Sequence, residues 1–107
     1  MAFVVRLSPR AESELEEAHG WATQHAPATA AAWLQRFKVA LLTLAENPER
    51  CQLAAEDKQL RCGLRQFLYG KKPNVFRVLF VLADPDVRIV AIRRASRRSI
   101  SRRDLDL

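Results

Sequence analysis

The sequence has no hydrophobic run long enough to cross a membrane. Its longest uninterrupted apolar run, residues 78–83, is far shorter than the roughly 20 residues that a transmembrane helix needs. The Met1-Ala2-Phe3 start lacks the basic region and the apolar segment of a secretion signal. We therefore expect a cytoplasmic protein with no membrane partner.

Cysteine and histidine are scarce as well. The chain has two of each, and no pair of them shows the spacing of metal ligands. Cys51 and Cys62 could pair, but in a chain without an export signal they are expected to be reduced thiols. The sequence thus predicts neither a disulfide nor a zinc site, and we expect no metal or other cofactor.

What the chain does have is enough apolar sequence for a core and an uneven charge. Its 107 residues are 49% apolar, which suits one domain spanning residues 1–107. Residues 1–57 hold five Lys/Arg and eight Asp/Glu, a net charge of −3, whereas residues 58–107 hold thirteen and four, a net charge of +9. The basic half predicts an acidic partner, for which nucleic acid, an anionic protein and a phosphate-rich substrate are all candidates.

The N-terminal half predicts a strand followed by two helices. Residues 3–7 are short and apolar, and Ser8 and Pro9 are typical of an N-cap and a first helical position. Small apolar residues then recur at helical spacing until residues 25–27 end the helix: Ala11, Leu15, Ala18, Ala22. A second helix ends at Asn47-Pro48 and carries a larger apolar stripe: Ala30, Trp33, Leu34, Phe37, Leu41, Leu44. Two helices joined this closely predict an antiparallel hairpin that needs a sheet to cover it.

The C-terminal half predicts three strands. Residues 49–59 show no period and are expected to form a loop, while residues 64–69 alternate as a strand does. Residues 70–74 carry turn chemistry, and two apolar strands, 75–82 and 87–92, flank a second turn. Ser101 and Asp104 have capping-box spacing and indicate a short helical turn. The predicted fold class is α+β, in the order β-α-α-β-β-β.

Short segments along nearly the whole chain carry a family resemblance. The order and spacing of these segments resemble the RelE/ParE superfamily of bacterial type II toxins: Phe3-Val-Val-Arg-Leu-Ser-Pro-Arg-Ala11, Ala32-Trp33, Leu44-Ala-Glu-Asn-Pro48, Leu64-Arg65, Phe76-Arg77-Val78-Leu79-Phe80 and Val87-Arg-Ile-Val-Ala-Ile92. The resemblance implies a curved antiparallel sheet packed on the helical hairpin. It also implies a toxin that a cognate antitoxin neutralises, and that either poisons DNA gyrase or cuts mRNA on the ribosome.

The resemblance also implies candidate site residues. In the RNA-cutting members, the arginine of a Tyr-Arg-x-x-Tyr/Phe strand and one just after the last strand act on the scissile phosphate, and Arg77 and Arg97 occupy these positions here. Arg65 stands at a third, commonly basic position. Such groups can stabilise a developing phosphate charge without a metal. We expect further basic residues to bind nucleic acid or an acidic partner: Lys71, Lys72, Arg93, Arg94, Arg98.

RNA cleavage through a ribose hydroxyl also needs proton carriers, which this sequence supplies poorly. Guanidinium groups do not deprotonate in the working range. Arg94 stands where many relatives have histidine, and no Tyr or His follows Tyr69. Lys71, Lys72 and Tyr69 remain candidates, although an exposed turn and a sheet position explain them as well.

The shortage of proton carriers favours a ParE-like gyrase poison. A RelE-like ribosome-dependent mRNA endonuclease stays as the alternative. If the chain is an enzyme, it is expected to be a metal-independent endoribonuclease that uses Arg65, Arg77 and Arg97. A third hypothesis is a non-toxic module that binds nucleic acid or a protein partner. It ranks last, because the sequence shows no RRM, KH or helix-turn-helix signature.

Overall fold

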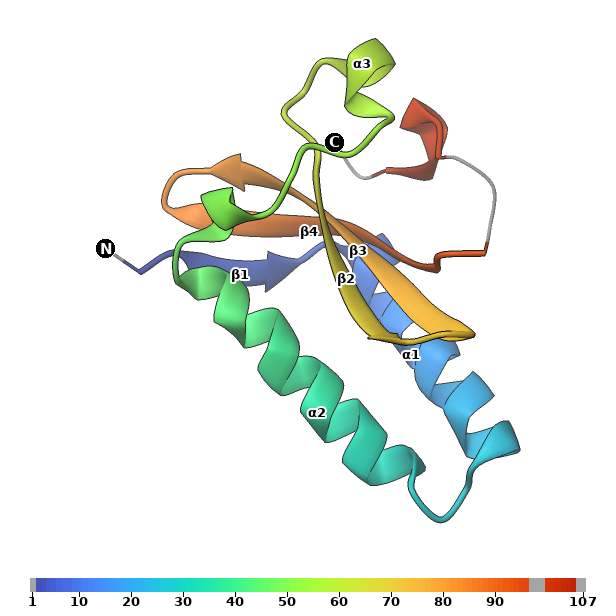
Figure 1. The fold of residues 1–107 in the computed structure, drawn as a ribbon. Coiled ribbons are helices and arrows are strands. Elements are labelled where there is room, and N and C mark those ends of the chain that lie inside the picture. The colour runs from blue at the N-terminus through green and yellow to red at the C-terminus, as the bar shows by residue number, and fades with distance from the viewer. Residues whose placement is uncertain (1, 97–99, 106–107) are drawn as a thin grey trace.

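The structure is a computed structural model, and it describes residues 2–96 and 100–105. Its main elements are β1 (Val4–Leu7), α1 (Pro9–His25), α2 (Ala30–Leu42), β2 (Arg65–Lys71), β3 (Asn74–Ala83) and β4 (Asp86–Arg94). Short turns of helix complete it: η1 (Thr43–Ala45), η2 (Pro48–Arg50), α3 (Asp57–Leu60) and η3 (Arg102–Asp104). The predicted α+β class and the order of the main elements are confirmed (Figure 1).

The four strands form one sheet in the order β1-β4-β3-β2. Strands β2, β3 and β4 are antiparallel neighbours, as expected, but β1 lies parallel to β4, with Val4 opposite Asp86. The sheet is therefore mixed, and the expectation of an antiparallel sheet is wrong for this one pair. The sequence pattern of residues 3–7 identifies a strand, but its direction depends on which distant strand it meets.

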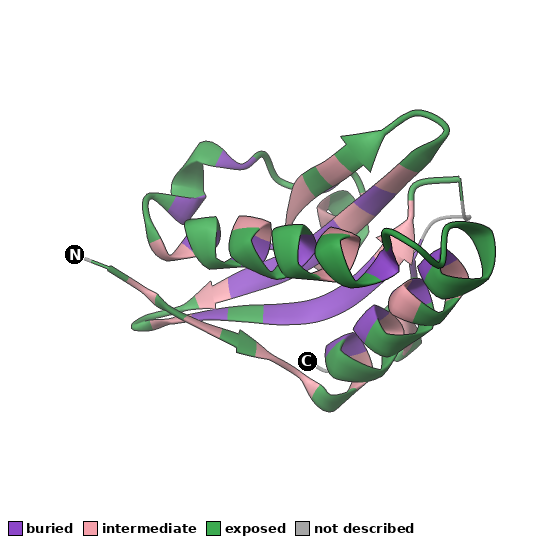
Figure 2. Ribbon diagram, turned by 90° about the horizontal axis from the view of Figure 1, so that it is seen from below, coloured by how far each residue is buried: buried purple, intermediate pink, exposed green. Residues whose placement is uncertain are grey.

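One face of the sheet is covered by the helical hairpin (Figure 1). The predicted small-residue face of α1 is buried against the sheet, with Ala11 completely inaccessible to solvent. In α2 the buried residues include Phe37, which stacks on Tyr69 of β2 with ring centroids 4.6 Å apart. Figure 2 shows the buried side of α1 turned toward the sheet. Close approach of α1 follows from its small side chains, as bulky ones would hold it away.

Ser8 joins β1 to α1 in the way the sequence predicts. Its side-chain oxygen accepts a hydrogen bond from the backbone N–H of Ala11 at 3.1 Å, which caps the helix. Its own N–H donates to the carbonyl of Ile89 in β4 at 2.9 Å. One residue thus ends the strand pairing and begins the helix.

The opposite face of the sheet is covered by the loop around α3 and by the C-terminal segment 100–105. Ile100 and Leu105 are buried there against Leu79 of β3, in a second apolar cluster. A bulge opposite Leu79 and Phe80 turns both Val90 and Ala91 of β4 toward this cluster. The sheet therefore has an apolar core on each side.

Residues 49–59 are mostly loop, as predicted, with η2 and the single turn α3 at their ends. Asp57 holds the loop by accepting hydrogen bonds from the N–H groups of Cys62 and Leu64 at 3.0 and 2.9 Å. The predicted capping box at η3 is confirmed, since Ser101 and Asp104 bond each other's backbone and side chain.

Cys51 and Cys62 are both free thiols, and burial raises the pKa of Cys51.

Across residues 2–96 and 100–105, no group of three His, Cys, Asp or Glu could hold a metal ion. No helix within those residues is long and apolar enough to span a bilayer.

Candidate functional site

Arg77 lies on β3 and points to the face of the sheet away from the helical hairpin. Its two terminal nitrogens donate to the two carboxylate oxygens of Glu56 at 2.9 and 2.8 Å, and its Nε donates to the side-chain oxygen of Gln66 at 2.9 Å. The two charged side chains are only 15% and 8% exposed. All three guanidinium nitrogens are thus engaged inside the protein.

Glu56 keeps its negative charge at any pH that cells reach. The hydrogen bonds from Arg77, helped by the N–H of Ile100 at 3.2 Å, lower the pKa of Glu56 from its ordinary value of 4.5 to about 2. The pair is therefore a permanent, neutralised ion pair that also ties the loop and the C-terminal segment to the sheet.

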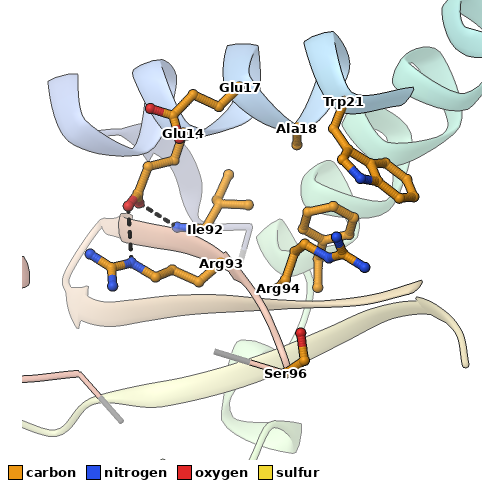
Figure 3. A pocket seen from close by; sticks show the side chains of 9 residues that line it. Glu14, Glu17, Ala18, Trp21, Ile92, Arg93, Arg94 and Ser96 are labelled. Carbon is orange, nitrogen blue, oxygen red and sulfur yellow. Dashed lines mark hydrogen bonds and ion pairs between the residues drawn. The ribbon is translucent and has the colours of Figure 1, made fainter. Parts of the chain in front are cut away.

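Arg93 stands directly opposite Arg77 in the β3–β4 register and is engaged in the same way. Its Nε donates to Glu14 of α1 at 3.1 Å, and a terminal nitrogen lies 3.4 Å from Asp104 of η3. The Glu14 carboxylate also accepts the backbone N–H of Ile92 at 2.9 Å. The pairing of β1 with β4 ends at Leu7 and Ile89. Beyond it, Glu14 of α1 accepts the N–H of Ile92 that β1 no longer reaches (Figure 3).

Arg65 lies on the other face of the sheet from Arg77. It shares its face of β2 with Tyr69, which packs in the core under the helices, and it donates to the backbone carbonyl of Cys51 at 2.7 Å. The two expected catalytic arginines that the structure describes therefore do not converge on one point. Arg97 and Arg98 lie outside the described residues.

Arg94 has a different environment, on the helix side of β4. Its guanidinium lies 4.6 Å from the ring centroid of Trp21 in α1 and donates to the side-chain oxygen of Asn74 at 3.2 Å. Among the described residues, no carboxylate pairs with it, and its Nε has no hydrogen-bond partner. Figure 3 shows Arg94 and Trp21 on the wall of a cleft of about 300 Å³ between α1 and β4. Lys71 and Lys72 are exposed at the neighbouring β2–β3 turn.

The potential proton carriers are not grouped around Arg77. Tyr69 is stacked on Phe37 on the helix side. His25 is exposed at the end of α1, stacked on Trp21 with ring centroids 4.3 Å apart, and His19 lines a groove between α1 and α2. No Tyr or His of residues 2–96 and 100–105 is hydrogen-bonded to Arg77, whose partners are Gln66 and Glu56.

Three residues that decide these environments were not identified from the sequence. They are Glu14 of α1, which accepts from β4, Glu56 of the loop before α3, which pairs with Arg77, and Trp21 of α1, which lies under Arg94. Each acts through a partner far away in the sequence, so no local pattern identifies it. The one available signal was weak: Glu56 and Asp57 are adjacent acids just before the basic half of the chain.

Comparison with solved structures gives the same overall architecture. A chain from the chromosomal ParDE TA system from P. aeruginosa superposes with a TM-score of 0.68 over 87% of this chain and 96% of that chain. The two are 14% identical, so the likeness concerns the fold alone. No curated protein matches the sequence significantly.

The sequence itself assigns the family. The model of the ParE toxin of the type II toxin-antitoxin system parDE matches residues 5–99. This chain belongs to the ParE toxin family and is the toxin component of a type II toxin-antitoxin system. Membership in that family implies a cognate antitoxin as its partner.

Proposed function

We propose that this toxin arrests growth by poisoning DNA gyrase and does not cleave RNA. The observation that carries the proposal is the engagement of Arg77: its charge is neutralised by Glu56, and each of its three guanidinium nitrogens donates to a side chain of the protein. A group that stabilises a transferring phosphate must have donors directed at the position where charge develops. In Arg77 the donors of these bonds point at Glu56 and Gln66, and the Glu56 carboxylate occupies the position where a phosphate would pair with both terminal nitrogens.

The relative positions of the other expected catalytic groups support the same proposal. Arg65 donates to backbone carbonyls on the opposite face of the sheet. The carboxylate that contacts Arg77, Glu56, is a weak base because its pKa is lowered to about 2. Trapping gyrase on cleaved DNA requires recognition and no proton transfer by the toxin. The exposed cations Lys71 and Lys72, with Arg94, are the residues that we assign to contact with an acidic partner or nucleic acid.

Two assays test the proposal. Induced expression in a bacterium should stop growth, and co-expression of the cognate antitoxin should restore it. Purified toxin added to gyrase, ATP and plasmid should then accumulate cleaved DNA. Cleavage of mRNA by the toxin with ribosomes present, without trapped gyrase, would contradict the proposal.

A paired variant separates structural from catalytic roles of Arg77. Replacing both members of the pair, as in the double substitution Glu56→Leu and Arg77→Met, removes two charges that neutralise each other and leaves no unpaired ion behind. We expect this variant to fold and to keep its toxicity. Loss of toxicity in a folded double variant would assign Arg77 a direct role at the target.

A further inference from the structure

A second concave surface lies on the helix side of the β2–β3 hairpin, on the face opposite to Arg77 and Glu56. This groove, about 520 Å³ in volume, runs between α2 and the hairpin. Its lining residues come from three elements: Trp33 and Arg36 of α2, Tyr69, Gly70 and Lys71 of β2, and Asn74 of β3. We refer to it below as the aromatic groove.

Each wall of the aromatic groove presents one aromatic ring and one cation. Trp33 and Arg36 are three residues apart on α2, which places them on the same helix face. Tyr69 and Lys71 are two residues apart on β2, which places them on the same face of the strand. A helix and a strand, rather than a loop, therefore hold the two rings and the two cations in place.

The two rings are fixed by the core beneath them. Phe37, which is completely buried, stacks on Tyr69 and meets Trp33 edge-on at a centroid distance of 5.3 Å. Trp33 also packs on Phe76 of β3 at 5.6 Å. Both rings remain partly accessible, so they offer rigid, preformed surfaces that lose little entropy on binding.

The hairpin geometry at one end of the groove depends on a glycine. Gly70 has φ of 105°, and a Cβ at this position would lie 2.4 Å from the carbonyl oxygen of Asn74. A side chain is therefore excluded there on both counts. The glycine lets Lys71 pair with Asn74 across the turn, and both residues line the groove.

The charge of the aromatic groove has one sign. No carboxylate lines it, and in the part of the chain that the structure describes no ion pair engages Arg36 or Lys71. Arg94 adjoins it through the hydrogen bond to Asn74. The groove between α1 and α2 differs, because it is lined by leucines together with acids and a lysine: Leu7, Leu15, Leu34, Glu12, Glu16, His19, Lys38.

These contrasts decide between two kinds of ligand. The groove between α1 and α2, with leucines flanked by charged residues of both signs, suits the apolar face of a protein segment. The aromatic groove instead offers rings, cations and a side-chain amide. Bases of a single strand stack on aromatic rings, while basic residues follow the phosphates. In a duplex the base faces are already covered by their neighbours.

We propose that the aromatic groove is a binding site for single-stranded nucleic acid. Trp33 and Tyr69 stack with bases, Arg36 and Lys71 contact the flanking phosphates, and the amide of Asn74 is placed to reach a base edge. The site is separate from Arg77 and Glu56. It does not depend on whether gyrase is the target of the toxin.

Binding of a labelled oligothymidylate of about 12 nucleotides, followed by fluorescence anisotropy, tests the phosphate contacts. The variant carries Arg36→Ala and Lys71→Ala; the control carries Lys38→Ala and Lys58→Ala, which remove two exposed cations elsewhere. We expect affinity to fall about tenfold in the variant and to change little in the control. Because each phosphate contact on a single strand contributes about 0.7 to the salt slope, the slope of log K against log salt should fall by about 1.4.

Trp33 fluorescence tests the stacking directly. In a Trp21→Phe variant, Trp33 is the only tryptophan, and the oligothymidylate should quench its emission. Equal loss of affinity in the variant and the control, equal affinity for a duplex, or no quenching on binding would overturn the proposal. Binding of a polyglutamate peptide without binding of the oligonucleotide would instead assign the groove to an acidic protein segment and would also overturn it.

Discussion

The two sides of the sheet use arginine in opposite ways. On the side away from the helices, Arg77 and Arg93 stand opposite each other and are held by carboxylates from segments outside the sheet. On the helix side, Arg94 rests on Trp21 without a carboxylate partner among the described residues. All three belong to the same hairpin, and two of them are sequence neighbours.

This difference separates positive charge that holds the fold from positive charge that is available to a ligand. Glu56 and Asp104 attach the α3 loop and the C-terminal segment to the sheet through the two arginines on that side. On the helix side, Arg65 bonds only backbone carbonyls and Arg94 only a ring and an amide, so the positive charge of neither is neutralised by a carboxylate among the described residues. Net charge alone therefore overstates the basic surface of this protein.

The largest expected effect is on the Arg77–Glu56 pair. Glu56→Ala leaves Arg77 buried without its counter-charge and should lower the free energy of unfolding by about 3–5 kcal/mol. Chemical denaturation measures the change, with Glu49→Ala, an exposed acid of the same loop, as the control. A loss of less than about 1 kcal/mol would mean that water replaces Glu56, and the contrast between the two sides would not hold.

The same pair should give stability a defined dependence on pH. Because the pKa of Glu56 falls from 4.5 to about 2 on folding, its contribution is fully present above about pH 4.5 and is lost as pH falls toward 2. The shift corresponds to about 3 kcal/mol. The stability difference between the wild type and Glu56→Gln should shrink over that window, which urea titrations at several pH values measure. A difference that stays constant with pH would contradict the assigned ion pair.

A smaller effect is expected at the edge of β4. Glu14→Ala removes the acceptor of the Ile92 N–H and one partner of Arg93, and should cost about 1.5–3 kcal/mol. Hydrogen exchange of the Ile92 amide should become faster in this variant. Glu17→Ala, an exposed acid on the same cleft, serves as the control and should change stability by no more than about 0.5 kcal/mol.

The smallest effect is expected at Arg94. Arg94→Met removes a cation–π contact and one hydrogen bond and should cost about 0.5–1 kcal/mol, well below the cost of Arg77→Met. Thermal unfolding of the two variants side by side compares their losses of stability. Equal losses would show that Arg94 is also a structural arginine, and would remove it from the proposed contact surface.

Local features of the sequence predicted most of the fold. The Ser8 cap, the small-residue face of α1, the strand hairpin and the capping box of Ser101 and Asp104 all depend on residues within a few positions of one another. The parallel pairing of β1 with β4 could not be predicted in this way, because it joins the two ends of the chain. The same limit applied to the site: a cluster of arginines was visible, but the side of the sheet that each one faces and its partner were not.

The sequence by itself determined the family, the order of the elements and the strongly basic character of the C-terminal half. It did so because hydrophobic period, capping residues and charge are properties of adjacent residues. Only the tertiary structure decided which cations are neutralised, because Glu14, Glu56 and Asp104 reach their arginines across the fold. Burial and distance fix the strength of an ion pair, and neither exists until the chain is folded.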